Sequence, residues 1–276
     1  MSLIYDQPTL RIVHLVQIPA AREPSVPLVV LTANQPPTTI STLRLTTTDD
    51  RPAESFDRYL IYFLLFAFAS GTLAHLLPAV LPVTRYTTDG LLFVLNGLVI
   101  WAVYRRNGDR WLFTWLFVAY WFTFAMEALG VATGAVFGEY AYGPTMWLQW
   151  LGVPFVIALN WCVLTLACND LACRMLPRAA RYADGRRGHF EVLVHAAVAA
   201  ILTALYDVAI EPVAIALDYW QWGGGEIPLQ NYLAWAAIAF LLSVPLQYLR
   251  IRFRSPVLPV YLFAQLFFFL VLNLLL

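Results

Sequence analysis

Long apolar stretches recur from residue 59 to the end of the chain, and short polar segments separate them. A helix needs about 20 apolar residues to cross a bilayer. Charged residues make up only 12% of the chain, about half their share in a soluble domain. The sequence therefore predicts an all-α fold, a polytopic integral membrane helix bundle with about seven transmembrane helices. The stretches lie near 59–81, 90–104, 111–131, 148–172, 190–212, 231–249 and 256–276.

Arginine alternates between the two sides of this predicted bundle. All 17 basic residues are arginines, and beyond residue 58 they concentrate in the connections that follow the second, fourth and sixth stretches. The connections after the third and fifth stretches contain none, and the first connection contains only Arg85. Positively charged connections stay on the cytoplasmic side of a membrane. We therefore expect a cytoplasmic N-terminus, an external C-terminus and a multi-pass protein of the cell (inner) membrane.

Residues 1–58 differ in composition from the rest of the chain. They are rich in threonine, proline and small polar residues and show no lasting helical period, which is typical of disorder. The apolar run "PLVVL" is too short for the core of a signal peptide. We expect a disordered N-terminal tail over 1–58 and a membrane-embedded domain over 59–276. The formal net charge of zero gives no reason to expect nucleic acid as a partner.

Three carboxylates lie in the outward-facing halves of the apolar stretches: Glu127, Asp207 and Glu211. The last two are four residues apart and share one face of a helix. A carboxylate at mid-membrane depth costs roughly 2.5–3.5 kcal/mol on insertion scales, so it usually marks a functional site. One alternative is that asparagine, tyrosine or tryptophan binds these acids merely to fix helix packing. Three acids in the outward-facing halves without a basic partner favour function, because such groups are expected to be partly protonated proton donors.

Amide and aromatic side chains near these acids predict a polar pocket within the apolar bundle. Tyrosine and tryptophan at the ends of spans are typical of an interfacial belt. Their ring faces also stabilise cations, so an acid set ringed by aromatic residues suits chemistry through a carbocation. The residues expected to bind substrate are Asn160, Trp161, Tyr140, Tyr142, Trp220, Trp222, Asn231 and Trp235.

Two shorter patterns have structural explanations. Gly130, Gly134 and Gly138 recur every four residues and predict close helix packing or a break into a loop. Asp170 stands four residues before Arg174, the spacing of an ion pair along a helix. Neither the histidines nor the three cysteines have the spacing of a metal or redox site, so we expect no metal and no cofactor.

Several separated motifs resemble carotenoid-biosynthesis membrane proteins of the bisanhydrobacterioruberin hydratase type, and the resemblance covers roughly residues 59–270. The "GGG" at 223–225 has no counterpart in that pattern. The matching motifs are "EALGVATGAVFGEYAYG" from Glu127, Val153–Pro154 followed by Trp161, Asp207 with "EPVA" from Glu211, "WQW" at 220–222, and "PLQNYLAW" at 228–235.

The resemblance implies a cofactor-independent carotenoid hydratase, a hydro-lyase. Such an enzyme adds water across the terminal isopropylidene double bond of an acyclic carotenoid of the lycopene, γ-carotene or bisanhydrobacterioruberin type, and gives a tertiary hydroxyl at C-1. The expected partners are a lipophilic carotenoid that enters from the bilayer, and water. Other enzymes of the carotenoid pathway are candidate partners.

The side chains suggest a division of roles for this chemistry. Asp207 or Glu211 would protonate C-2 while the other acid holds its hydrogen bond, and Glu127 would position or deprotonate the attacking water. Amides would orient these groups, and tryptophans would wall the cavity and stabilise the cation. The residues expected in these supporting roles are Asn160, Asn231, Trp161, Trp220 and Trp235.

Three other functions fit parts of the pattern. Cyclisation or isomerisation of a carotenoid end group would use the same cation without capturing water. A proton-coupled transporter would need acids spread along a path through the membrane, often within an inverted repeat, whereas these acids cluster on one side. A carotenoid-binding scaffold would tolerate removal of all three acids.

Overall fold

The computed structural model describes residues 51–176 and 188–276, and each of its long helices could cross a membrane by length and composition. Seven such helices in this part of the chain confirm the predicted all-α, multi-pass class. Residues 1–50, most of the predicted tail, lie outside the described residues, as does much of the arginine-rich fourth connection. The helices are α1 (Arg51–Leu76), α2 (Leu81–Asn107), α3 (Trp111–Thr133), α4 (Phe155–Met175), α5 (His189–Ala216), α6 (Leu229–Tyr248) and α7 (Val257–Leu275).

The second helix is longer than its hydropathy predicts. It begins at Leu81, whereas the apolar stretch begins at residue 90, because the intervening "LPVTRYTTD" is polar. Threonine hydroxyls in this segment donate hydrogen bonds to carbonyls about one turn earlier. Thr84 donates to the Leu81 carbonyl at 3.2 Å, and Thr88 donates to the Thr84 carbonyl at 2.9 Å. Hydroxyls that are satisfied in this way allow a helix to continue through a polar sequence.

Two other spans begin or end away from the predicted residues. α1 begins at Arg51, inside the predicted tail, and ends at Leu76 instead of residue 81. Pro78 follows its end and disfavours helical geometry at the residue before it. The predicted start of the fourth span, 148–154, is not helical but holds a small hairpin in which β2 (Gln149–Trp150) pairs with β3 (Val153–Pro154).

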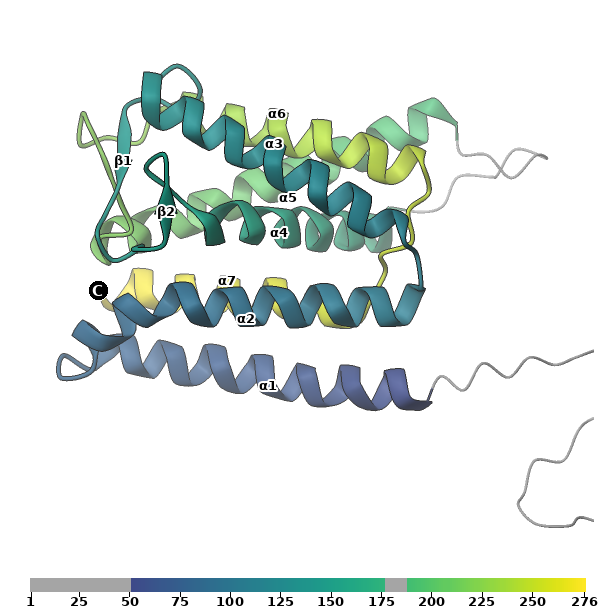
Figure 1. Ribbon diagram of the computed structural model, residues 1–276, viewed down its shortest axis with the longest axis horizontal. Coiled ribbons are helices and arrows are strands. Elements are labelled where there is room, and N and C mark those ends of the chain that lie inside the picture. Colours follow the sequence, from purple (N-terminus) through teal and green to yellow (C-terminus); the bar gives the residue numbers. More distant parts are fainter. Residues whose placement is uncertain (1–50, 177–187) are drawn as a thin grey trace, which may run out of the picture. The chain divides into compact units, whose positions relative to one another are not determined.

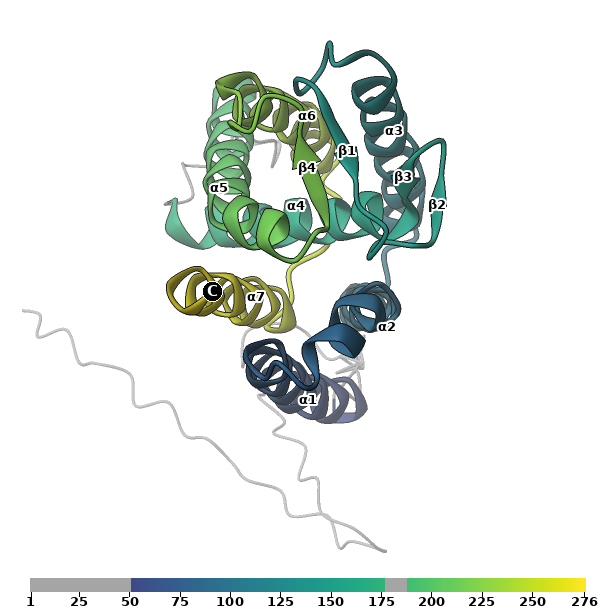
Figure 2. The same cartoon turned by 90° about the vertical axis from the view of Figure 1, so that its left-hand side faces the viewer.

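α4 is the central helix of the bundle. In its most apolar 18-residue window, 83% of the residues are buried, against at most 50% in the other six helices. It packs against α2 and α7 on one side and against α3 and α5 on the other. Figure 2 shows α1, α2 and α7 grouped together below α4, and α3, α5 and α6 on its opposite side. The bundle therefore has two groups of three helices, one on each side of α4.

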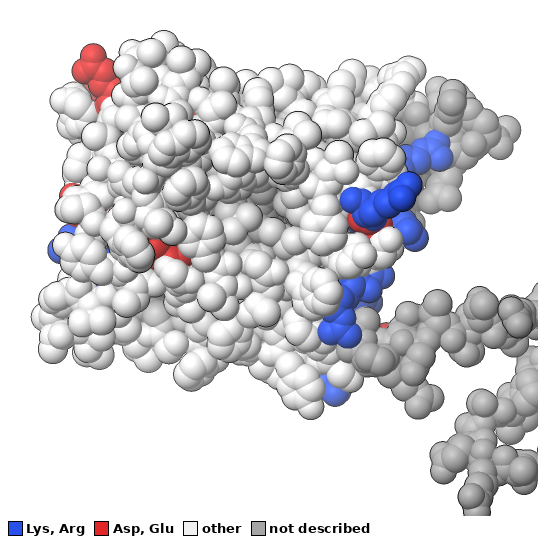
Figure 3. Space-filling model, in the orientation of Figure 1, with Lys and Arg blue, Asp and Glu red and all other residues white. Residues whose placement is uncertain are grey.

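Ion pairs gather at one end of the bundle, which we call the arginine end. Arg106 Nη1 lies 2.7 Å from Asp57 Oδ2, and Arg174 Nε lies 2.6 Å from Asp170 Oδ2. The predicted pair between residues 170 and 174 is confirmed, and Arg254 approaches the same aspartate at 3.4 Å. Figure 3 shows blue arginine atoms concentrated at the right-hand end of the visible face. This distribution fits the alternation in the sequence, while the assignment of the arginine end to the cytoplasm stays a prediction.

The opposite end, which we call the strand end, carries a two-stranded ribbon that the sequence analysis missed. β1 (Tyr140–Tyr142), between α3 and α4, pairs antiparallel with β4 (Trp220–Trp222), between α5 and α6. Figures 1 and 2 show the ribbon across this end of the bundle. Side chains alternate across a strand, so the tyrosines of "YAY" and the tryptophans of "WQW" share one face. Strands of three residues are too short to produce a detectable period in the sequence.

Replacing Gly143 by alanine should weaken this ribbon. Gly143 N donates to the Tyr219 carbonyl at 2.8 Å, and an added Cβ would lie only 2.0 Å from the Asp218 carbonyl oxygen. We expect a loss of about 1–3 kcal/mol in the free energy of unfolding, measured as a lower thermal midpoint in detergent. Gly224→Ala is the matched control, because no atom lies within 4 Å of its added Cβ. Equal midpoints for the two variants would contradict this role.

Candidate functional site

The three membrane acids meet beneath the ribbon. Glu127 comes from α3, and Asp207 and Glu211 come from α5; each is only 2% exposed. All three line one pocket, which we call the acid pocket. Ten of the eleven predicted site residues lie on its wall, together with two that sequence reasoning missed, Phe137 and Ile157. The ten are Glu127, Tyr140, Tyr142, Trp161, Asp207, Glu211, Trp220, Trp222, Asn231 and Trp235.

Asn160 is the predicted site residue that lies elsewhere. Its Oδ1 accepts hydrogen bonds from Tyr261 at 2.7 Å and from Gln265 Nε2 at 3.3 Å, both on α7. Consecutive side chains on a helix point about 100° apart, so Asn160 and Trp161 cannot share one direction. In the described part of the chain no hydrogen bond joins Asn160 to an acid, so the orienting role predicted for it does not fit its position. It lines a neighbouring cavity instead.

Glu211 is held as the acceptor of three hydrogen bonds. The indole nitrogens of Trp220 and Trp222 each donate to Oε2 at 2.9 Å, and Asn231 Nδ2 donates to Oε1 at 3.0 Å. Hydrogen bonds from N–H donors to a carboxylate stabilise its ionised form. Glu211 is therefore the acid in the pocket whose surroundings best support a negative charge.

Asp207 lies one turn away on the same face of α5 and has fewer donors. Asn231 Nδ2 donates to Asp207 Oδ2 at 2.7 Å, so a single amide bridges Asp207 and Glu211. Among the residues that the structure describes, Asp207 accepts no other hydrogen bond. Two adjacent carboxyl groups in a low-dielectric site cannot both carry a charge cheaply. The hydrogen bonds assign the charge to Glu211 and leave Asp207 as the acid better suited to hold a proton.

Glu127 is bound by the tyrosine hydroxyl that β1 brings over it. Tyr140 Oη donates to Glu127 Oε2, and the Tyr142 ring lies 5.6 Å from the Tyr140 ring. Burial, and then the negative charge of Glu127, raise the pKa of Tyr140 and Tyr142 well above the ordinary tyrosine value. Both hydroxyls therefore keep their protons at physiological pH and act as hydrogen-bond donors.

Glycines in the "EALGVATG" motif allow the loop after α3 to fold back over Glu127. Gly134 ends the helix in the left-handed conformation, with φ 66°. An added Cβ on Gly130 would lie 2.5 Å from the Phe137 ring and 3.2 Å from the Tyr140 hydroxyl. The predicted break into a loop is therefore present, whereas the close contacts of Gly130 are with the returning chain and not with another helix.

Aromatic rings form the remaining walls of the acid pocket. Trp161 stacks on Trp235 with ring centroids 3.7 Å apart, and Trp235 stacks on Phe137 at 5.0 Å. Tyr140 and Trp222 lie 5.2 Å apart within the ribbon. The ribbon aromatics face the acids, so an outward interfacial belt does not describe them. Their faces can instead stabilise a positive charge that develops inside the pocket.

Arg85 lies near the site but forms no ion pair with its acids in the described residues. It lies in the first turns of α2 at the strand end, the same end as the three acids. Its Nη2 donates to the Leu217 carbonyl at 3.2 Å, and within the described residues no ion pair joins it to an acid of the pocket. Asp89, one turn later and 2% exposed, is a further buried acid that the sequence analysis did not single out.

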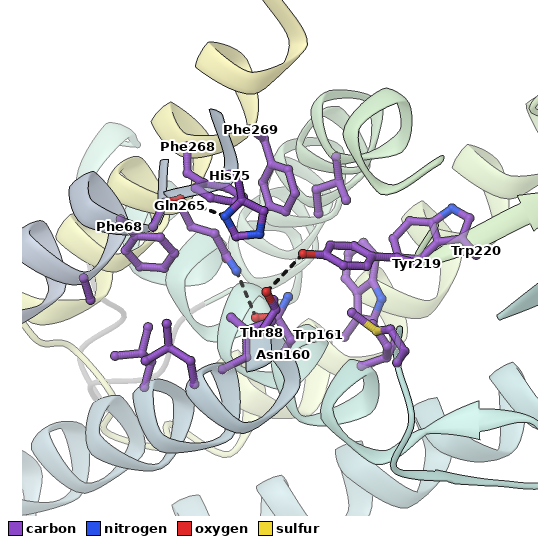
Figure 4. Close-up of a pocket in the computed structure, with 18 residues that line it drawn as sticks. Phe68, His75, Thr88, Asn160, Trp161, Tyr219, Trp220, Gln265, Phe268 and Phe269 are labelled. Carbon is purple, nitrogen blue, oxygen red and sulfur yellow. Dashed lines mark hydrogen bonds between the residues drawn. The ribbon is translucent and has the colours of Figure 1, made fainter. Parts of the chain in front are cut away.

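A second space, which we call the apolar cavity, adjoins the acid pocket. Ile157, Trp161 and Trp220 line both of them. Figure 4 shows Phe68, Phe268 and Phe269 from α1 and α7 on its wall, with His75 and Gln265 among them. The chain thus places a hydrocarbon-lined space directly beside buried acids.

The pocket has the parts needed to protonate an apolar molecule and to stabilise the resulting cation. Asp207 is placed to donate a proton, Glu211 has the donors to stabilise a negative charge, and the rings supply electron-rich faces. Glu127 and Tyr140 can together hold a water molecule. Across residues 51–176 and 188–276, no set of three His, Cys, Asp or Glu side chains is arranged to hold a metal ion.

Comparison with known proteins gives two matches. The family model described as "Carotenoid biosynthesis protein" matches residues 89–276, which include all three acids. A protein named bisanhydrobacterioruberin hydratase, from Haloarcula japonica, is 28% identical over 118 residues; that stretch is 41% of this chain and 37% of the hydratase. No solved structure matches.

The indole donors to Glu211 should contribute measurably to stability. Trp222→Phe removes one hydrogen bond to a charged group, and we expect a loss of about 1.5–3 kcal/mol in the free energy of unfolding. The same change in a Glu211→Gln background should cost less, because a neutral acceptor binds the indole more weakly. Unfolding of the four proteins of this double-mutant cycle gives the coupling directly.

Trp150→Phe is the matched control for the cycle, since Trp150 lies at the same end of the bundle and is 51% exposed. We expect it to change stability little in either background. An equal loss from Trp222→Phe with glutamate or glutamine at 211 would contradict the assigned hydrogen bond.

Proposed function

Because the chain belongs to the carotenoid biosynthesis protein family, we propose that it is a carotenoid hydratase. It would add water across the terminal isopropylidene double bond of an acyclic carotenoid and leave a tertiary hydroxyl at C-1. The observation that carries this proposal is the set of buried acids, which form no ion pair in the described part of the chain and lie beneath aromatic rings beside an apolar cavity. The reaction has no redox step and uses water as the second substrate.

Asp207 is the proposed proton donor. A trisubstituted alkene is a weak base, so the acid that protonates it must be shielded from water and aimed at C-2. Asp207 meets the first requirement by its burial, and its single amide partner leaves its second oxygen available to the pocket. Transfer of its proton to C-2 would form the new C–H bond and leave a tertiary cation at C-1.

Glu211 and the aromatic rings would stabilise this cation. Glu211 keeps its negative charge through the three N–H donors that bind it, and it lies one helical turn from Asp207. Trp161, Trp220 and Trp222 present rings to the same pocket. Fixed charges and ring faces act strongly in a site from which water is excluded, and they need no reorganisation during the reaction.

Glu127 would bring water to the cation. Tyr140 holds one carboxylate oxygen of Glu127, which fixes the group for a second interaction with a water molecule. The water oxygen forms the C–O bond at C-1, and Glu127 accepts the proton that the water then loses. Return of that proton to Asp207 restores the starting state. The net change is addition of one hydrogen atom at C-2 and one hydroxyl at C-1.

The distribution of acids favours this chemistry over proton-coupled transport. A transporter would need protonatable groups along a path through the bundle. Toward the arginine end, the buried Asp170 is paired with Arg174 and Arg254. Glu127, Asp207 and Glu211, which form no ion pair in the described residues, gather instead around a single pocket at the strand end.

Substitution of the acids tests the proposal. Asp207→Asn should lower hydration of lycopene by about 100-fold or more, and Glu127→Gln by a similar factor, as for general acids and bases elsewhere. The measurement is chromatography with mass spectrometry of pigments from bacteria that accumulate lycopene and express each variant. The expected product is heavier by one water and has an unchanged visible spectrum, because the hydrated bond lies outside the conjugated chain.

Asp89→Asn is the matched control, since Asp89 is equally buried at the same end of the bundle but does not line the acid pocket. We expect this variant to retain hydration. Unchanged pigment with folded wild-type protein in the membrane would refute the hydratase proposal. An isomeric product of equal mass would indicate end-group cyclisation, and wild-type rates in Asp207→Asn would remove that residue from its role.

A further inference from the structure

The apolar cavity lies where the long chain of a substrate must go when its end group occupies the acid pocket. The two spaces share Ile157, Trp161 and Trp220 on their walls. A carotenoid end group is continuous with a long hydrocarbon chain, so a site that admits the end group needs an adjoining apolar channel. Directly beside the acid pocket, the structure provides such a space between α1, α2, α4, α5 and α7.

The walls of the cavity suit hydrocarbon because several of their polar groups are already bound within the protein. Tyr219 Oη donates to Thr88 Oγ1 at 3.2 Å, and Asn160 Oδ1 accepts hydrogen bonds from α7. His75 Nδ1 lies 2.7 Å from the Gly71 carbonyl of the same helix, whereas His75 Nε2 and Gln265 Oε1 have no partner among the described residues. Polar groups with protein partners lose little when an apolar ligand displaces water around them.

A groove on the lipid-facing surface leads toward this cavity. Its walls include Leu65 and Ala69 of α1 and Phe263 and Phe267 of α7. Phe68 belongs to both the groove and the cavity. The Phe68 ring contacts Tyr261 edge-on at 5.8 Å and Phe268 at 6.3 Å, and the residue is 8% exposed. Phe68 therefore stands between the groove and the cavity.

We propose that a linear polyene enters sideways from the bilayer between α1 and α7, passes Phe68, and lies in the apolar cavity with its end group in the acid pocket. The proposal rests on the carotenoid substrate of the proposed function and adds the path and the binding site of the chain. A long hydrocarbon has negligible solubility in water, and a lateral opening removes the need for it to leave the membrane.

Gly71 offers a direct way to fill the cavity. It lines the cavity on α1, and an added Cβ would meet only the Phe268 ring at 3.8 Å, an ordinary contact. Gly71→Leu should therefore fold and place its side chain in the space proposed for the polyene. Gly97→Leu is the matched control, because Gly97 lies on the exposed face of α2 with no atom within 4 Å of an added Cβ.

The test measures bound pigment and product separately. Each protein is purified from lycopene-accumulating cells, and absorbance gives the pigment retained per protein after detergent exchange. We expect Gly71→Leu to retain about tenfold less pigment than wild type, and Gly97→Leu to match wild type. Retention without any hydrated product would leave the cavity proposal standing while the hydratase proposal fails. Equal retention in both variants, or none in wild type, would overturn the cavity proposal.

A second pair of variants tests the lateral path. Ala69→Trp places a large ring in the groove, whereas Leu73→Trp places the same ring on an exposed position of α1 outside it. Pigment-free proteins are mixed briefly with lycopene-loaded vesicles, and the retained pigment is measured over time. We expect Ala69→Trp to slow uptake several-fold relative to Leu73→Trp. Equal rates for the two variants would refute the path between α1 and α7.

Discussion

The hydrogen bonds around Glu211 determine how the strand end of the bundle is arranged. A buried carboxylate must accept hydrogen bonds from the protein in place of those from water. Glu211 receives them from two indoles of β4 and from Asn231 at the start of α6. β4 holds β1 in register, and β1 brings Tyr140 over Glu127 on α3. The arrangement of the acid pocket thus depends on the hydrogen-bond donors that Glu211 requires.

The lengths of the apolar stretches and the positions of the charged residues were sufficient to predict the fold class and the number of helices. Ten of the eleven site residues predicted from the sequence line one pocket, because acids that are costly in a membrane have to face side chains that can donate hydrogen bonds to them. Hydropathy did not predict the first turns of α2. Their threonines are polar by a hydropathy scale, although the hydroxyls donate to carbonyls of the same helix. The polar residues therefore caused the predicted start of this helix to fall too late in the chain.

Contacts between distant segments could not be derived in the same way. The pairing of "YAY" with "WQW" joins residues about 80 positions apart, and three residues carry no period that identifies a strand. The direction of Asn160 depends on the exact rotation of α4, because a step of one residue turns a side chain by about 100° around the helix. Phe137 was missed because an apolar ring near the end of a span carries no chemical signal of its own. Each of these features requires the tertiary structure.

The placement of arginines separates the acids that form ion pairs from the acids that we propose as catalytic groups. Asp170 at the arginine end forms ion pairs with two arginines, Arg174 and Arg254. Arg85 lies at the strand end, but the Leu217 carbonyl binds its guanidinium group. The amide of Asn231 and the indoles of β4 bind the acids without contributing a positive charge. A neutral set of donors can order carboxyl groups and still leave one of them able to give up a proton to a hydrocarbon.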